Sequence, residues 1–201
     1  MDTEVIKTET WAELLYDSLR ELGITIFCYV PDAGHRVLIE RSISDNNVIS
    51  VPLTTEEEGV ALLAGAHLGG KRGVLLMQSS GVGNCINMLS LINAGRFPFL
   101  TIVSMRGDFG EQNPWQLPMG QAVEPCLMAM DTLCLRIETR EDIPSTTEAA
   151  TQMAYKSDQS VAILLSQKLI GAKPLTPGQM AMRQPISYTA VTRRCLACHV
   201  Q

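Results

Sequence analysis

Several features are missing from this sequence of 201 residues, and each absence argues against a class of protein. There is no run of about 18 consecutive apolar residues, so we expect no membrane-spanning helix. Lysine and arginine are not clustered and the net charge is -5, which argues against a nucleic-acid-binding surface. Residues 1–7 are polar and acidic, so they do not predict a secretory signal, and we expect a cytoplasmic protein.

The cysteines do not indicate a disulfide framework. Four of the six lie among apolar neighbours, where buried thiols are the usual finding, and structural disulfides are rare without export. Cys195, Cys198 and His199 form the pattern Cys-x-x-Cys-His, which matches the attachment motif of c-type haem. Because no export signal accompanies this pattern, we interpret it as part of a loose tail. We therefore predict no metal ligands in this chain.

Apolar segments that alternate with helical patterns dominate the rest of the sequence. The apolar run at residues 24–30 is continuous, which is typical of a strand buried on both faces in a parallel sheet. Further strands are predicted at residues 48–51, 73–77, 98–104, 133–137 and 160–165. Helices are predicted at residues 10–21, 36–42, 81–93, 122–130 and 143–156, with another that begins at Glu56.

This order of elements predicts an α/β fold with an open, doubly wound, mostly parallel sheet of about six strands and helices on both faces. We place the domain at residues 1–168 and an irregular tail at residues 169–201. Ligands bind such sheets beyond the carboxyl ends of the strands. The loops expected at that edge are residues 31–35, 54–58, 78–84 and 105–121.

Three consecutive glutamates, Glu56, Glu57 and Glu58, occupy the first turn of one predicted helix. Thr55 and Glu58 have the spacing of a capping box, and the helix dipole stabilises carboxylates at this end. This structural interpretation accounts for acids here but does not require three of them. The glycines and alanines that follow indicate that another element packs closely against the helix.

A glycine-rich stretch at residues 77–87 lies where a strand is predicted to turn into a helix. Its Gly-x-Gly pattern suits close approach of a ligand to the backbone, and the helix N-terminus suits an anion. The stretch is not a dinucleotide-binding fingerprint, because the third glycine is missing, nor a P-loop, because it has no Gly-Lys-Ser/Thr. By themselves, the glycines fit either a tight turn or a cofactor site.

Three motifs, in this order, resemble the pyrimidine-binding domain of thiamine diphosphate enzymes, most closely that of the sulfopyruvate and phosphonopyruvate decarboxylases. The resemblance covers residues 10–168. The motifs are Glu56-Glu-Glu-Gly-Val-Ala with Ala64-Gly-Ala-His-Leu, Gln78-Ser-Ser-Gly-Val-Gly-Asn, and Met105-Arg-Gly-Asp-Phe-Gly-Glu with the following Pro114-Trp-Gln-Leu-Pro-Met-Gly.

The resemblance implies that Glu56 hydrogen-bonds the N1′ atom of the cofactor's aminopyrimidine and so promotes removal of the thiazolium C2 proton. Glu57 is the alternative if the register differs by one residue. Only a carboxylate suits this role, because it must accept a proton or a strong hydrogen bond from a ring nitrogen. The other cofactor-binding residues that the resemblance implies are Gln78, Ser80, Gly81, Gly83 and Asn84.

Three residues at the same edge are candidates for substrate binding. The planar guanidinium of Arg106 suits an anionic substituent, although an ion pair with Asp108 or Glu111 explains the same residue. Asp32 and His35 follow the first strand and are candidates for contact with the substrate or for support of the site. A turn-forming role explains Asp32 equally well.

Members of this family continue into a second domain, where a Gly-Asp-Gly motif and a downstream asparagine hold Mg2+ and the diphosphate. The present sequence has no Gly-Asp-Gly motif. The resemblance therefore implies the α-type half of a split decarboxylase for a small anionic 2-oxo acid, such as 3-sulfopyruvate or 3-phosphonopyruvate. It also implies a β-type partner that holds Mg2+, and we expect self-association. An acetolactate-synthase-like carboligase component and a non-catalytic binding or regulatory partner are the alternatives.

Overall fold

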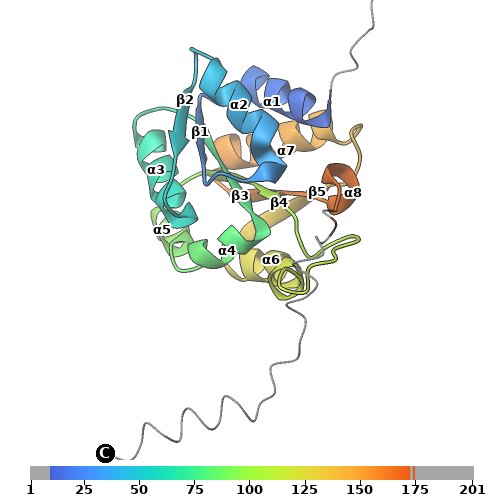
Figure 1. Cartoon of the computed structure of the whole chain (residues 1–201). Helices are drawn as coiled ribbons and strands as arrows, with labels where there is room; N and C mark the ends of the chain where they lie inside the picture. Colours follow the sequence, from blue (N-terminus) through green and yellow to red (C-terminus); the bar gives the residue numbers. More distant parts are fainter. Residues whose placement is uncertain (1–9, 173, 175–201) are drawn as a thin grey trace, which may run out of the picture.

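The computed structural model describes residues 10–172 and 174 (Figure 1). At its centre is a six-stranded parallel sheet with the strand order β2-β1-β3-β4-β6-β5. The strands are β1 (Ile26–Tyr29), β2 (Ile49–Pro52), β3 (Gly73–Gln78), β4 (Phe99–Ser104), β5 (Thr132–Ile137) and β6 (Ser160–Leu165). All six predicted strands are present, and the predicted fold class is confirmed.

Helices cover both faces of the sheet and enclose two hydrophobic cores (Figure 1). One face carries α1 (Trp11–Glu21), α2 (Arg36–Ser44) and α7 (Ile143–Ser157). The other carries α3 (Glu56–Leu68), α4 (Ser79–Cys85), α5 (Leu89–Gly95) and α6 (Leu117–Ala129). The short helices η1 (Ala33–His35) and α8 (Gln167–Ile170) follow β1 and β6.

Burial along the strands explains why their sequences are uniformly apolar. Every residue of β1, β4 and β6 is buried, because helices lie on both faces of these strands. The edge strand β2 is different, since none of its residues is fully buried and Ile49 is 56% exposed. No helix among the described residues combines the length and apolar character needed to cross a bilayer.

Some boundaries differ from the prediction. The prediction of a single helix at residues 81–93 is wrong, because α4 ends at Cys85 and a separate helix, α5, begins at Leu89. The first of these helices packs against both α6 and α3, and the second packs against α3. The long loop is shorter than expected, since α6 begins at Leu117, with Pro118 in its first turn, where proline is tolerated.

The start of the predicted tail is ordered. Helix α8 (Gln167–Ile170) crosses the predicted domain boundary, and Leu169 and Ile170 pack against the core beside α1 and α7. The Cys195, Cys198 and His199 pattern lies outside the described residues.

Candidate active site

The parallel sheet brings the segments that follow four strands to one edge. Asp32 follows β1, Glu56 begins the helix after β2, Gln78 ends β3, and Arg106 follows β4. These residues are far apart in sequence, and the topology alone places them on the same side of the sheet.

Glu56 is the first residue of α3 and is only 8% exposed. Its Oε2 atom accepts a hydrogen bond from Nδ2 of Asn84 at 2.8 Å. A Cβ atom added to Gly81 would lie 2.5 Å from Oε1 of Glu56, so the carboxylate fills the space that a side chain at Gly81 would need. Two positions of α4 therefore hold this acid.

The two neighbouring glutamates have different surroundings. Glu57 accepts a hydrogen bond from the Thr55 hydroxyl at 3.2 Å. Glu58 is exposed and accepts from the hydroxyl and the backbone N–H of Thr54 at 2.7 and 3.0 Å, and these hydrogen bonds lower the pKa of Glu58. The predicted capping box is wrong, because the Thr55 side chain donates to Glu57 and makes no capping hydrogen bond. Burial thus separates Glu56 from the other two acids.

The predicted passage from a strand into a helix is present, because β3 leads directly into α4 with Gln78 at the N-cap, and no separate glycine turn lies between them. Gly81 and Gly83 both lie inside this helix. Gly81 is buried beneath Glu56, whereas Gly83 is exposed, with Sδ of Met119 at 3.4 Å from a Cβ placed there. The absence of a side chain at Gly81 thus makes room for a glutamate of the same chain.

A hydrogen-bond network surrounds Asp32. Its Oδ2 atom accepts from the Ser104 hydroxyl at 2.6 Å and from the N–H of Gly34 at 3.0 Å, and Oδ1 accepts from Gln78 at 3.4 Å. Burial by itself would raise the pKa of Asp32, but the hydrogen bond from Ser104, nearby His35 and the remaining hydrogen bonds together lower it. Ser80 donates to Oε1 of Gln78 at 3.0 Å, so Gln78 joins α4 to the first loop.

His35 lies beneath this network and is completely buried. Its Nε2 atom is 3.1 Å from the carbonyl oxygen of Met77. Burial lowers the pKa of His35, which favours the neutral imidazole. The His35 side chain therefore connects the first loop to the end of β3 from inside the fold, without exposure at the surface of the site.

Arg106 pairs with Glu111, one of the two partners named for it from the sequence, whereas Asp108 pairs with Arg136. Nε and Nη2 of Arg106 donate to the two carboxylate oxygens of Glu111 at 2.8 and 3.1 Å. The Glu111 side chain is fully buried and also accepts from Gln167 and from the N–H of Gly107. Burial opposes its ionisation, but the hydrogen bond from Arg106 and those from backbone N–H groups lower the pKa of Glu111 to about 2.

A cavity of about 160 Å³ lies between this ion pair and Asp32. Its wall includes Ser104, Ile170 at the end of α8, and the two residues that follow this helix. The contributions of Ser104, Glu111 and Gln167 were not predicted as parts of the site. Glu111 was predicted only as a possible partner of Arg106. Ser104 and Gln167 carry no sequence signal, because serines and glutamines are common at the ends of strands.

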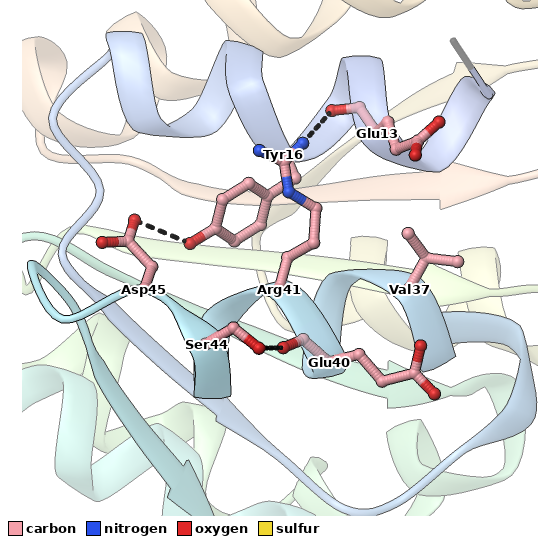
Figure 2. Close-up of a pocket in the computed structure, with 7 residues that line it drawn as sticks. All are labelled: Glu13, Tyr16, Val37, Glu40, Arg41, Ser44 and Asp45. Atoms are coloured by element: carbon pink, nitrogen blue, oxygen red, sulfur yellow. Dashed lines mark hydrogen bonds between the residues drawn. The ribbon is translucent and has the colours of Figure 1, made fainter. Parts of the chain in front are cut away.

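A larger hollow of about 460 Å³ lies between α1 and α2, on the other face of the sheet (Figure 2). Some of its polar groups are paired with one another. The Tyr16 hydroxyl donates to Asp45 at 3.0 Å, and Arg41 donates to the backbone oxygen of Glu13 at 3.3 Å. None of the predicted site residues lines this hollow. Within the described part of the chain, no three His, Cys, Asp or Glu residues are grouped so as to hold a metal ion.

The sheet and its helices define an α/β domain that is shared with larger enzymes of known structure. The 2-oxoglutarate:ferredoxin oxidoreductase of Magnetococcus marinus matches with a TM-score of 0.64 and 18% identity, over 80% of this chain and 29% of that chain. An enzyme from Mycobacterium smegmatis described as thiamin diphosphate-dependent matches with a TM-score of 0.60 and 15% identity, over 83% and 34%. At these identities the likeness shows the fold.

No family model matches the sequence, but individual relatives do. Sulfopyruvate decarboxylase subunit alpha of Methanocaldococcus jannaschii is 38% identical over 151 residues, which are 75% of this chain and 89% of the relative. The subunit of the same name from Methanothermobacter thermautotrophicus is 36% identical over 77% and 94%. Phosphonopyruvate decarboxylase of Streptomyces viridochromogenes is 32% identical over 87% of this chain but 45% of the relative. The chain belongs to the family of sulfopyruvate decarboxylase alpha subunits, and the resemblance seen in the sequence is confirmed.

Proposed function

We propose that this chain is the α-type subunit of a thiamine-diphosphate-dependent carboxy-lyase. Its substrate would be a small anionic 2-oxo acid such as 3-sulfopyruvate or 3-phosphonopyruvate. Membership of the family supports the reaction class. The observation that carries the proposal is the buried Glu56 carboxylate, which a single neutral donor holds at the sheet edge where ligands of this fold bind.

The residues around Glu56 fit the aminopyrimidine of the cofactor. When bound, thiamine diphosphate would supply the carbon nucleophile and the electron-accepting ring that decarboxylation needs. Glu56 would accept a strong hydrogen bond from a ring nitrogen, because a carboxylate shielded from water binds a polarised N–H tightly. Gln78, Ser80 and Gly83 would line the rest of this site, Asn84 would contribute through its hydrogen bond to Glu56, and Gly81 would leave the carboxylate the room it needs.

We place the substrate beside Asp32 and Arg106, at the cavity between the first loop and the end of α8. Asp32 would face the substrate as a carboxylate, since its hydrogen bonds favour the ionised form. Arg106 would offer its remaining guanidinium nitrogen, because Nε and Nη2 already bind Glu111. His35 would not touch the substrate, because it is completely buried; its backbone N–H holds the first loop by donating to the carbonyl oxygen of Asp32 at 3.2 Å.

A second chain would complete the enzyme. This chain spans 45% and 40% of the lengths of two phosphonopyruvate decarboxylases, and its alpha-subunit relatives carry a name that implies another subunit. We propose that a β-type chain corresponding to the other half holds Mg2+ and the diphosphate, that the assembly also self-associates, and that it works in the cytoplasm.

The first test is CO2 release from 3-sulfopyruvate and 3-phosphonopyruvate by this chain mixed with a β-type chain, thiamine diphosphate and Mg2+. We expect activity in the mixture, none from this chain alone, and none with Glu56→Gln. Glu57→Gln is the matched control and should retain activity. Activity that survives Glu56→Gln but not Glu57→Gln would move the role to Glu57. Acetolactate as the product would favour a carboligase, and an inactive mixture would favour a non-catalytic partner.

A further inference from the structure

The contact between α3 and α4 contains one polar interaction that packing does not explain. Asn84 is an exposed residue, yet its amide donates to the buried carboxylate of Glu56 at 2.8 Å. An exposed asparagine contributes little to a hydrophobic core. Its side chain is directed to an acid that the cores of the domain do not need.

The chemistry of the donor is also informative. The Asn84 amide is neutral, so it orients the carboxylate of Glu56 without cancelling its charge. A lysine or arginine at this position would form an ion pair and occupy the carboxylate, as Arg106 does with Glu111. An oriented acid that keeps its charge can still accept a hydrogen bond from a ligand.

We propose that Asn84 is a positioning residue for Glu56, an inference that rests on the proposed function. A glutamate side chain has several rotatable bonds, and an unrestrained carboxylate would seldom point at the cofactor. The Glu56 side chain fills the space beside Gly81 on one side, and the hydrogen bond from Asn84 fixes the carboxylate on the other. Asn84 thus contributes to cofactor binding and turnover through Glu56 rather than by its own contact with the cofactor.

A double-mutant cycle distinguishes an effect of Asn84 through Glu56 from direct contact between Asn84 and the cofactor. Binding of thiamine diphosphate to the complex with the β-type chain is measured by calorimetry in the presence of Mg2+, for the unmutated chain, Asn84→Ala, Glu56→Ala and the double variant. We expect Asn84→Ala to weaken binding about tenfold, the factor for one hydrogen bond to a charged group, and to add less than about twofold once Glu56 is absent. An equal effect in both backgrounds would overturn the inference, because it would mean that Asn84 binds the cofactor itself.

A kinetic measurement tests whether Asn84 orients the Glu56 carboxylate. We expect Asn84→Ala to lower kcat and the exchange rate of the cofactor's C2 proton about tenfold, with a change of less than about twofold in KM for the 2-oxo acid. Asn84→Asp should lose more, since it replaces the donor with a second carboxylate. The matched control is Asn87→Ala, which removes an exposed asparagine three residues further along the chain and should change neither quantity.

Thermal unfolding of this chain alone completes the test. Asn84→Ala should leave the Tm unchanged, and a lower Tm together with proportionate loss of binding would assign Asn84 a structural role instead. Turnover that Glu56→Gln abolishes but Asn84→Ala leaves intact would overturn this inference alone. Absence of cofactor binding and CO2 release in the unmutated complex would overturn the proposed function and this inference with it.

Discussion

Glu56 and Glu111 are both buried carboxylates near the same sheet edge, but their surroundings are opposite. Glu111 accepts two hydrogen bonds from Arg106 and others from Gln167 and backbone N–H groups. Among the described residues, Asn84 is the only side chain that donates to Glu56. An ionised carboxylate can accept about four hydrogen bonds, so Glu111 is satisfied within the fold and Glu56 is not.

The difference separates a carboxylate that stabilises the domain from one that is available to a ligand. Substitutions of these two glutamates should therefore have different effects. Changes at Glu111 should lower the stability of this chain, whereas changes at Glu56 should abolish activity and leave stability almost unchanged.

The largest effect on stability is expected from Glu111→Ala. This change leaves the partly buried guanidinium of Arg106 without its partner, which should cost about 4 kcal/mol of unfolding free energy. Urea unfolding of this chain measures it. Glu56→Gln is the control and should change the unfolding free energy by less than about 1 kcal/mol. Equal losses from the two variants would remove the distinction between the sites.

The pH dependence of stability should identify the same group. The pKa of Glu111 is about 2 in the folded chain and about 4.5 ordinarily, so ionised Glu111 contributes about 3 kcal/mol at neutral pH. Because the folded pKa is the lower one, this contribution is present above about pH 4.5 and is lost as the pH falls towards 2. The unfolding free energy of Glu111→Gln should fall less steeply across that window. Parallel curves would assign the acid sensitivity to other carboxyl groups.

Gly81→Ala tests the Glu56 side of the comparison. The new Cβ atom would lie 2.5 Å from Oε1 of Glu56, so the carboxylate must move. We expect kcat of the complex to fall about a hundredfold, the scale of a misplaced catalytic group, while the chain still folds. Gly65→Ala is the matched control, because Gly65 also lies inside a helix and its Cβ would meet nothing within 4 Å. Similar activity for the two variants would contradict the placement of Glu56.

The smallest effect is expected on the far face of the sheet, in the hollow between α1 and α2 (Figure 2). Tyr16→Phe removes the hydrogen bond to Asp45, which should cost about 1 kcal/mol of unfolding free energy. Burial, reinforced by Asp45, raises the pKa of Tyr16 to about 12, which is consistent with a phenol held in its neutral form. The activity of the complex should be unchanged. A loss of activity would mean that this face also serves the site.

Much of the fold follows from local sequence patterns. Continuous apolar runs such as residues 160–165 predict strands covered on both faces, and the alternation of elements predicts a parallel sheet. Local patterns failed where neighbours decide the outcome. The Thr55 hydroxyl binds Glu57 instead of capping α3, and the stretch after β3 forms two short helices, of which the first packs against both α6 and α3 and the second against α3.

Some features of the site could likewise be predicted from the sequence, and others could not. The sequence alone singled out Glu56, Gln78 and Asn84, because each lies in a short motif that resembles one of the family's motifs. Only the tertiary structure decided that Glu56 is the buried acid, that Gly81 makes room for it, and that Arg106 is taken up by Glu111. The reason is physical: composition and periodicity determine which segments become strands and helices, whereas burial and hydrogen-bond partners depend on which strand ends the sheet brings together.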